Sequence, residues 1–141
     1  MKLGGGCHCG NMTYRLEWPG DEGPRAARSC TCSFCTKHNA NYISHPDAVL
    51  DLTIANPEKL SRYRFATGTA QFLVCLECGV IPVVLGHQEG KLQGAVNAST
   101  LEDFELPDAP IPVTFEGESL DQRLRRRKKY WIGRVTVKEG S

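Results

Sequence analysis

The cysteines constrain this chain more than any other feature, because they come in three tight clusters. The clusters are Cys7-x-Cys9, Cys30-x-Cys32-x-x-Cys35 and Cys75-x-x-Cys78, and they contain all seven cysteines of the 141 residues. Short spacings of this kind are typical of thiolates that bind a metal, and an odd count argues against complete disulfide pairing. We therefore expect metal-bound thiolates rather than a disulfide framework.

The first and third clusters have the form of two zinc half-sites. A C-x-C pair in an extended segment projects both sulfurs to one face, and a C-x-x-C turn followed by glycine is a common half-site. Gly10 and Gly79 directly follow these two clusters. Two half-sites far apart in sequence make one four-thiolate site with no open coordination position, which contributes to folding. We predict a structural zinc ion bound by Cys7, Cys9, Cys75 and Cys78.

The second cluster leaves three thiols, Cys30, Cys32 and Cys35. Three protein ligands plus a water or substrate is the arrangement of catalytic zinc sites, and a thiol that binds zinc is deprotonated and can attack an electrophilic carbon. Two alternatives stay open. His38 would close the site as a fourth ligand and make it structural, and a weakly held three-thiolate site would be empty or oxidised to a disulfide.

Apolar and polar residues alternate in "NMTYRLEW", residues 11–18, which predicts a half-buried strand. Turn residues separate further short β-rich runs, at 41–44, 48–54, 62–66, 70–75, 80–86, 111–115 and 130–137. Pro82 cannot donate to a ladder, so its strand is predicted to be an edge strand or to carry a bulge. Helix signals occur at 100–106 and at 119–129, where Ser119 is a candidate N-cap. The expected fold is one mainly β domain over residues 1–141, built of short antiparallel strands with one or two short peripheral helices.

The order G-x-C-x-C-G, C-x-C-x-x-C, C-x-x-C-G resembles the glutathione-dependent formaldehyde-activating enzyme family, also called the GFA or centromere protein V (CENP-V) domain. The resemblance runs from Gly5 through at least Gly79, and "VNASTLEDFEL", residues 96–106, echoes the family too. It implies a zinc-containing β-tent fold, with a closed site at the first and third clusters and a catalytic site at the second. It also implies a carbon–sulfur lyase-type enzyme acting on a small-molecule thiol, such as glutathione joined with formaldehyde to give S-(hydroxymethyl)glutathione.

A basic run, "RLRRRKK" at residues 123–129, follows the candidate cap. The formal net charge is only +1, so no overall field points to nucleic acid or an anionic membrane as partner. We interpret the run as a solvated surface, with a grip on phosphate or an acidic ligand as the alternative. The second functional hypothesis is accordingly a non-catalytic zinc β-tent that binds a partner through this basic segment. Methionine-sulfoxide reduction would need a further redox cysteine, and none follows Cys78.

Aromatic residues near the second cluster are candidate pocket residues, namely Phe34 and Tyr42. Trp131 is expected to be buried in a last strand, and His8, His45 and His87 are expected to be loop residues. The N-terminus lacks the apolar stretch of a signal peptide, and no run approaches the roughly 18 apolar residues of a membrane-spanning helix. A cytoplasmic location is therefore expected.

Overall fold

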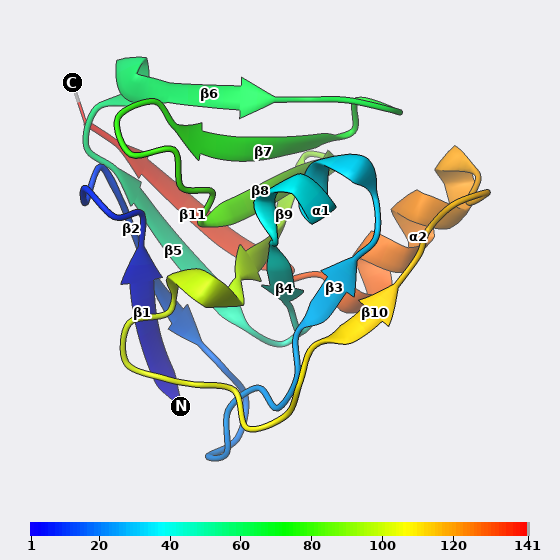
Figure 1. Cartoon of the computed structure of the whole chain (residues 1–141), viewed down its shortest axis with the longest axis horizontal. Coiled ribbons are helices and arrows are strands. Elements are labelled where there is room, and N and C mark those ends of the chain that lie inside the picture. The colour runs from blue at the N-terminus through cyan, green and yellow to red at the C-terminus, as the bar shows by residue number, and fades with distance from the viewer. Residues whose placement is uncertain (141) are drawn as a thin grey trace.

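The computed structural model describes residues 1–140 of the chain, which form a mainly β fold of two sheets (Figure 1). The smaller sheet has four strands in the order β1-β2-β5-β11. Its strands are β1 (Lys2–Gly6), β2 (Met12–Glu17), β5 (Val49–Ile54) and β11 (Arg134–Glu139). The first three are antiparallel, whereas β11 runs parallel to β5. The predicted mainly β class is therefore confirmed.

The larger sheet has seven strands in the order β10-β3-β4-β9-β8-β7-β6. Its strands are β3 (Arg28–Cys30), β4 (Asn41–Ile43), β6 (Leu60–Tyr63), β7 (Ala70–Cys75), β8 (Val83–Gln88), β9 (Lys91–Asn97) and β10 (Ile111–Val113). All neighbours are antiparallel except β10 and β3, which are parallel.

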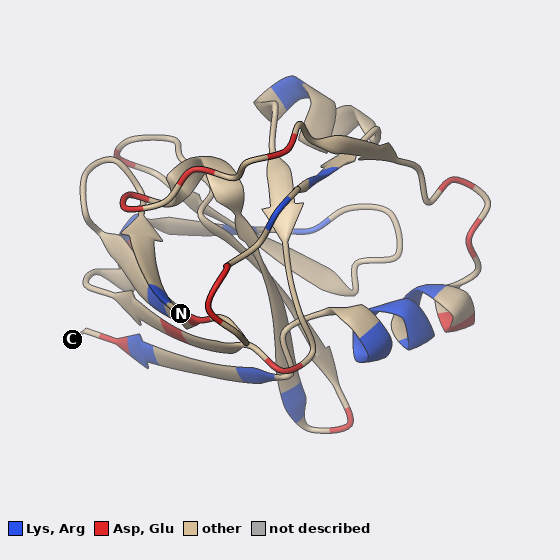
Figure 2. Cartoon of the chain, turned by 90° about the horizontal axis from the view of Figure 1, so that it is seen from below, with Lys and Arg blue, Asp and Glu red and all other residues tan. Residues whose placement is uncertain are grey.

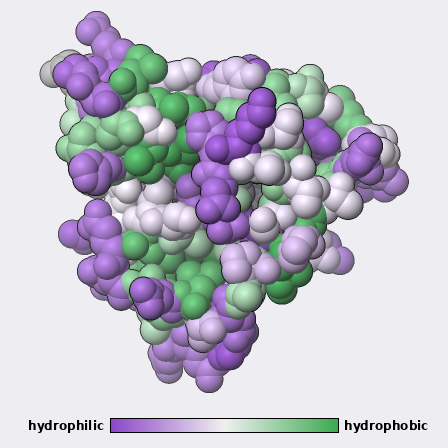
Figure 3. Space-filling model, in the orientation of Figure 1, coloured by the Kyte–Doolittle hydropathy of each residue, from purple (hydrophilic) through white to green (hydrophobic). Residues whose placement is uncertain are grey.

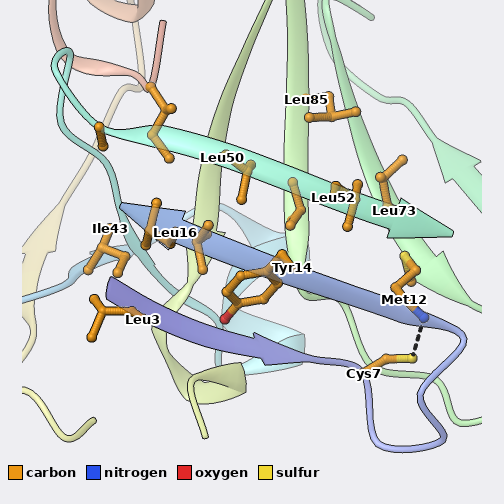
Figure 4. Packing of buried hydrophobic residues seen from close by; sticks show 14 of the residues in the cluster. Leu3, Cys7, Met12, Tyr14, Leu16, Ile43, Leu50, Leu52, Leu73 and Leu85 are labelled. Atoms are coloured by element: carbon orange, nitrogen blue, oxygen red, sulfur yellow. Dashed lines mark hydrogen bonds between the residues drawn. The ribbon is translucent and has the colours of Figure 1, made fainter. Parts of the chain in front are cut away.

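The main core lies between the two sheets (Figure 4). In β2 every second residue is buried, and Leu50 and Leu52 of β5 point to the same side as Leu16 and Met12 of β2. The larger sheet supplies Leu73, Val83, Leu85 and Val96 to this core. A strand with one face against the core alternates in this way, because successive side chains point to opposite faces.

The larger sheet is also buried on its second face. Val84 and Ala95 alternate with the core residues of β8 and β9, and they join Ala70, Tyr42 and Trp131 in a separate apolar cluster. Burial on both faces explains why β8 has an uninterrupted apolar run instead of strict alternation. The second face carries the pocket described below.

Two helices lie on the side of this second face. Helix α1 (Ser33–His38) follows β3, and helix α2 (Leu120–Tyr130) precedes β11. Ser119 caps α2 as predicted, since its side chain accepts from the Gln122 N–H and the Gln122 side chain accepts from the Ser119 N–H. Beyond α2, Ile132 pairs with Gly94 of β9 through two backbone hydrogen bonds of 2.9 and 3.1 Å. This bridge carries the chain from the larger sheet to the smaller one.

The structure differs from the predicted elements in several places. The sequences of strands β1, β3 and β9 do not alternate between apolar and polar residues, and these strands were not predicted. Helix α1 was not predicted either. The predicted helix at 100–106 is absent from the described residues, where only a short 3-10 turn, η2 (Ala98–Thr100), lies before extended chain. The run 130–137 forms a strand only from Arg134, and Trp131 caps α2 instead. A second 3-10 turn, η1 (Pro57–Lys59), precedes β6.

Pro82 does not belong to an edge strand. It precedes β8, which begins at Val83 and lies between β7 and β9 in the sheet. Its carbonyl accepts a hydrogen bond of 2.8 Å from the Asn97 N–H. The sheet therefore loses only the hydrogen bond that a backbone N–H at position 82 would donate. Within residues 1–140, no helix is long and apolar enough to cross a bilayer.

Replacing Leu50 with alanine should test the core between the sheets. Leu50 is completely buried, so L50A should lower the free energy of unfolding by about 2 to 5 kcal/mol. The control L120A changes a leucine that is 48% exposed and should stay within about 0.5 kcal/mol of the parent. Urea unfolding of both variants at one fixed zinc concentration makes the comparison, and equal losses would contradict this account of the core.

Candidate metal centres and pocket

Cys7, Cys9, Cys75 and Cys78 converge at one end of the two sheets, with all four sulfurs within 4.8 Å of one another. The Cys9 sulfur lies 3.8 Å from that of Cys7 and 3.5 Å from that of Cys75. These separations match the roughly 3.8 Å between sulfurs around a tetrahedral ion with metal–sulfur bonds near 2.3 Å. The first pair lies in the loop from β1 to β2 and the second at the end of β7, so the cluster connects the smaller sheet to the larger one.

Glycines allow the tight turns of both half-sites. Gly10 has a φ of 84° and Gly79 a φ of 79°, a region that costs other residues strain. The Gly79 N–H donates to the Cys75 carbonyl at 2.8 Å, and the Met12 N–H donates to the Cys7 sulfur at 3.3 Å (Figure 4). Backbone donors to sulfur favour the thiolate form, which is the form that binds a metal.

The pKa values of two of these thiols, Cys78 and Cys9, are shifted in opposite directions. Burial acts to raise the pKa of Cys78, but backbone N–H groups and the neighbouring thiols of Cys75 and Cys9 lower it to about 6. The Asn11 N–H acts to lower the pKa of Cys9, yet the thiols of Cys75, Cys7 and Cys78 together with burial raise it to about 12. A cation placed among the sulfurs would remove this competition, because metal coordination deprotonates a thiol.

The second cluster is assembled by the junction between β3 and α1. Cys30 ends β3, Cys32 is the N-cap of α1, and Cys35 lies in its first turn, with all three sulfurs within 4.8 Å of one another. The Cys32 sulfur takes the usual place of a capping oxygen and accepts from the Cys35 N–H at 3.4 Å. The C-x-x-C spacing therefore brings the sulfurs of Cys32 and Cys35 together beside that of Cys30.

One thiol of this cluster is acidic. A hydrogen bond from the Cys35 thiol lowers the pKa of Cys30 to about 5 against the effect of burial, with help from Cys32 and from the charge of Arg126. The same hydrogen bond and burial raise the pKa of Cys35. The cluster can thus present a thiolate at neutral pH.

His38 does not join the three thiols. Among the described residues the second cluster contains cysteines only, and His38 is exposed and lies against the Phe34 ring at 4.6 Å between centroids. The alternative in which His38 closes the site is therefore wrong in this structure. Phe34 itself belongs to an aromatic cluster with Tyr63, Phe65 and Phe72.

The second cluster lies in the wall of a pocket of about 350 Å³ on the second face of the larger sheet. The floor consists of strand residues, namely Tyr42, Ala70, Phe72, Val84 and Ala95. The rim and remaining walls come from the loop at 65–67, from residues 113–116 and from α2 with Trp131. On the outer surface seen in Figure 3, hydrophobic and hydrophilic residues are interspersed. Tyr42 lines the pocket as predicted, whereas Phe34 does not line it and packs against the lining residues Phe65 and Phe72.

Helix α2 brings part of the basic run into this pocket, contrary to the interpretation as a solvated surface. In Figure 2 the helix is blue over most of its length. Arg123, Arg126 and Arg127 line the pocket, and Arg127 is buried. Only Arg125, Lys128 and Lys129 are exposed as expected. The spacing of the three inward residues follows the helical period, which places residues 123, 126 and 127 on one face.

A single carboxylate holds two of these guanidinium groups. Glu118 accepts from Arg126 at 2.9 and 3.1 Å and from Arg123 at 3.2 Å, and Arg126 also stacks on Phe115 at 3.6 Å. The two charges lower the pKa of Glu118, with the hydrogen bond from Arg126 as the main cause. From the sequence, a ligand-binding role for these arginines was only the alternative, because no motif marks an arginine that tertiary packing turns inward.

Two buried polar atoms in this region have no hydrogen-bond partner in the described part of the chain. They are the Tyr42 hydroxyl and the Arg127 Nε. Burial raises the pKa of Tyr42, and the charges of Cys35, Cys30 and Cys32 raise it further, so its hydroxyl keeps its proton beside the cluster. Trp131 is buried as predicted, but it lines this pocket beneath the Arg127 guanidinium instead of packing within a strand.

Two sheets joined by one four-cysteine cluster, with a three-cysteine cluster in a pocket wall, define a mainly β protein with two candidate metal centres. Residues 2–115 match the family described as glutathione-dependent formaldehyde-activating enzyme, and the chain belongs to this family. None of the curated proteins compared with the chain matches it. A crystal structure of a Rhodobacter sphaeroides protein is similar at 27% identity, covering 78% of this chain and 99% of that one with a TM-score of 0.55.

The two clusters predict that the chain binds two metal ions. Native mass spectrometry of protein purified anaerobically with excess zinc should find both, and the double variant C30S/C35S should keep the ion of the other cluster and its fold. Loss of both ions from this variant, or a single ion in the parent, would contradict two independent centres.

Proposed function

We propose that the protein is a zinc-dependent carbon–sulfur lyase-type enzyme that adds a small-molecule thiol to a small aldehyde, and that glutathione and formaldehyde are its substrates. The product is then S-(hydroxymethyl)glutathione, and the reverse reaction splits the same carbon–sulfur bond. Family membership supports the class of reaction and the thiol.

One observation carries the proposal: Cys30, Cys32 and Cys35 line the pocket, whereas the other four cysteines do not. The donor set fits zinc in both places, because thiolates within 4.8 Å of one another suit this ion. Four cysteines between two sheets suit a structural ion with no room for substrate. Three cysteines beside a pocket leave one position open and suit a catalytic ion.

A zinc ion held by Cys30, Cys32 and Cys35 would supply the charge that keeps a bound thiol deprotonated. In the overall addition, the sulfur of the thiol forms a bond to the aldehyde carbon and the carbon–oxygen π bond breaks. The proton lost from the thiol ends on the aldehyde oxygen, so neither an oxidant nor a reductant is required.

The protein itself would provide position and a dry environment. Phe72 and Val84 of the floor and Trp131 of the wall are apolar and would keep water from the reacting carbon. The unpaired Tyr42 hydroxyl lies beside the cluster and is suited to donate to a cluster sulfur, as the outer partners of metal ligands do.

The non-catalytic binding hypothesis has less support. It relies on a solvated basic run, but Arg123 and Arg126 are engaged by Glu118 and Arg127 is buried in the pocket. The exposed Arg125 and Lys128 have acidic partners in Asp121 and Glu89. The basic surface left for a macromolecular partner is therefore small.

Replacing Cys32 and Cys78 should separate the two roles. C32S should abolish catalysed formation of S-(hydroxymethyl)glutathione, followed by NMR with ¹³C-labelled formaldehyde above the uncatalysed rate, and should keep the parent circular dichroism spectrum. C78S should unfold the chain, because a structural zinc ion contributes on the order of 10 kcal/mol to small metal-bound domains. If C32S unfolds as C78S does, or keeps its activity, the division into catalytic and structural centres is wrong.

Replacing Tyr42 with phenylalanine should test the hydroxyl beside the cluster. Removing an outer partner of a metal ligand commonly lowers metal affinity or activity by about 10- to 100-fold, and we expect Y42F to fall in this range. Zinc competition with a chromogenic chelator and the same NMR assay measure the two effects. Unchanged affinity and unchanged rate would show that the hydroxyl contributes to neither.

A further inference from the structure

The pocket has an excess of positive charge that its own residues do not balance. Four arginines line it, namely Arg28, Arg123, Arg126 and Arg127, against one lining carboxylate, the exposed Glu116. Glu118 neutralises part of this charge through Arg123 and Arg126. Within residues 1–140, neither Arg28 nor Arg127 forms an ion pair with a carboxylate.

Arg127 is the most unusual of the four. It is only 6% exposed, and its Nη1 donates to the Thr69 hydroxyl at 2.7 Å while its Nε has no acceptor. The guanidinium lies 4.8 Å from the centre of the Trp131 ring. A buried cation without a counterion is unfavourable, and a guanidinium stacked on an aromatic ring is held in one orientation. Such a group is prepared to bind an anion.

Arg28 places a second guanidinium near the thiols. It lies two residues before Cys30 in β3, so the two side chains leave the strand on the same face, with Cα atoms about 7 Å apart. Its Nη2 donates to the Ser44 hydroxyl at 2.7 Å, which orients the group without neutralising it. Both arginines are therefore oriented by neutral hydroxyls and line the same pocket as the second cluster.

We propose that Arg28 and Arg127 bind carboxylate groups of the thiol substrate and make the enzyme selective for anionic thiols. This proposal rests on the proposed function for the reacting thiol, but the binding of a carboxylate does not require any reaction. A guanidinium matches a carboxylate through two parallel hydrogen bonds, which gives orientation as well as affinity. A carboxylate held at this wall fixes where the sulfur of the same molecule lies relative to the second cluster.

The carboxylate fits the site better than a nucleic-acid backbone does. The pocket measures about 350 Å³ and its floor is apolar and aromatic, which suits one small organic acid. Arg127 is one of three pocket arginines that α2 supplies, and α2 lies beyond residues 2–115 that match the family, whereas Arg28 lies within them. The selectivity therefore depends in part on a segment that the family match does not cover.

The test uses a ligand that carries the carboxylates but cannot coordinate as a thiolate. S-methylglutathione has this property, and its dimethyl ester is the matched probe without the carboxylates. Isothermal titration into the zinc-loaded full chain should show that the diacid binds about tenfold or more tightly than the diester. Equal affinity for the two probes would overturn the proposal.

Arginine variants assign the effect to residues. R127Q and R28Q should each weaken binding of the diacid by about 10- to 100-fold and leave binding of the diester unchanged. R125Q is the control, because Arg125 is on the same helix but is exposed and paired with Asp121, and it should bind the diacid as the parent does. Circular dichroism would show whether R127Q folds. If it does not, R127K is the substitute, because it keeps the positive charge but loses the two parallel N–H donors of the guanidinium, and it should still weaken binding of the diacid.

Two outcomes separate this proposal from a simpler electrostatic role and from the proposed function. If the arginines only offset the charge of the cysteine cluster, R127Q will weaken both probes equally and lower zinc affinity, and the proposal is overturned. If no addition to formaldehyde is catalysed but diacid binding depends on Arg127, the proposed function fails and the carboxylate site stands. If addition is catalysed equally well with 2-mercaptoethanol and is insensitive to R127Q, the carboxylate site fails and the function stands.

Discussion

The contact between Cys7, Cys9, Cys75 and Cys78 is the constraint on which the rest of the structure depends. Strand β1 has the sequence KLGGG, so it contributes little side-chain packing to hold its end against the larger sheet. The cysteines after it do this instead, by meeting the end of β7. The same strand β7 carries Ala70 and Phe72 in the pocket floor. The position of the pocket floor is therefore linked through one strand to the junction between the sheets.

The sequence predicts those parts of the fold that local chemistry determines. Alternation in β2 and the capping box at Ser119 both identify their elements, because strand pleating and helix capping act within a few residues. Strands β1 and β9 contain glycines and polar residues and lack the pattern, since their place is decided by pairing with neighbours distant in sequence. The helix predicted at 100–106 fails for a similar reason: Leu101 bridges to Gly5 of β1, and this tertiary pairing outweighs a weak helical preference.

Prediction of the site divides in the same way. Metal half-sites have fixed spacings, so the two groups of cysteines could be sorted from the sequence, and the structure brings each group together. The basic run at residues 123–129 has no fixed spacing that would identify a binding site. Whether Arg127 faces water or a pocket depends on how α2 is held, by Glu118 before the helix and by Ile132 after it. Charge composition cannot reveal this, because a solvated helix and an inward-facing one have the same sequence of charges.

The charges of the pocket connect the three-cysteine cluster with the arginines that line the same pocket. Three thiolates around a divalent cation leave a net charge of about −1, and a bound substrate thiolate makes this about −2. Arg126 already lowers the pKa of Cys30, so the positive wall favours the thiolate form of the cluster. The positive charge of the pocket also favours an anionic molecule over a neutral one of equal shape, because Arg28 and Arg127 have no carboxylate partner among the described residues. All seven cysteines lie in the family-matched segment, whereas three of the four pocket arginines lie beyond it in α2. A change of Arg127 in α2 would therefore alter the proposed selection by charge without replacing a cysteine, whereas a change of Arg126 would also act on the pKa of Cys30.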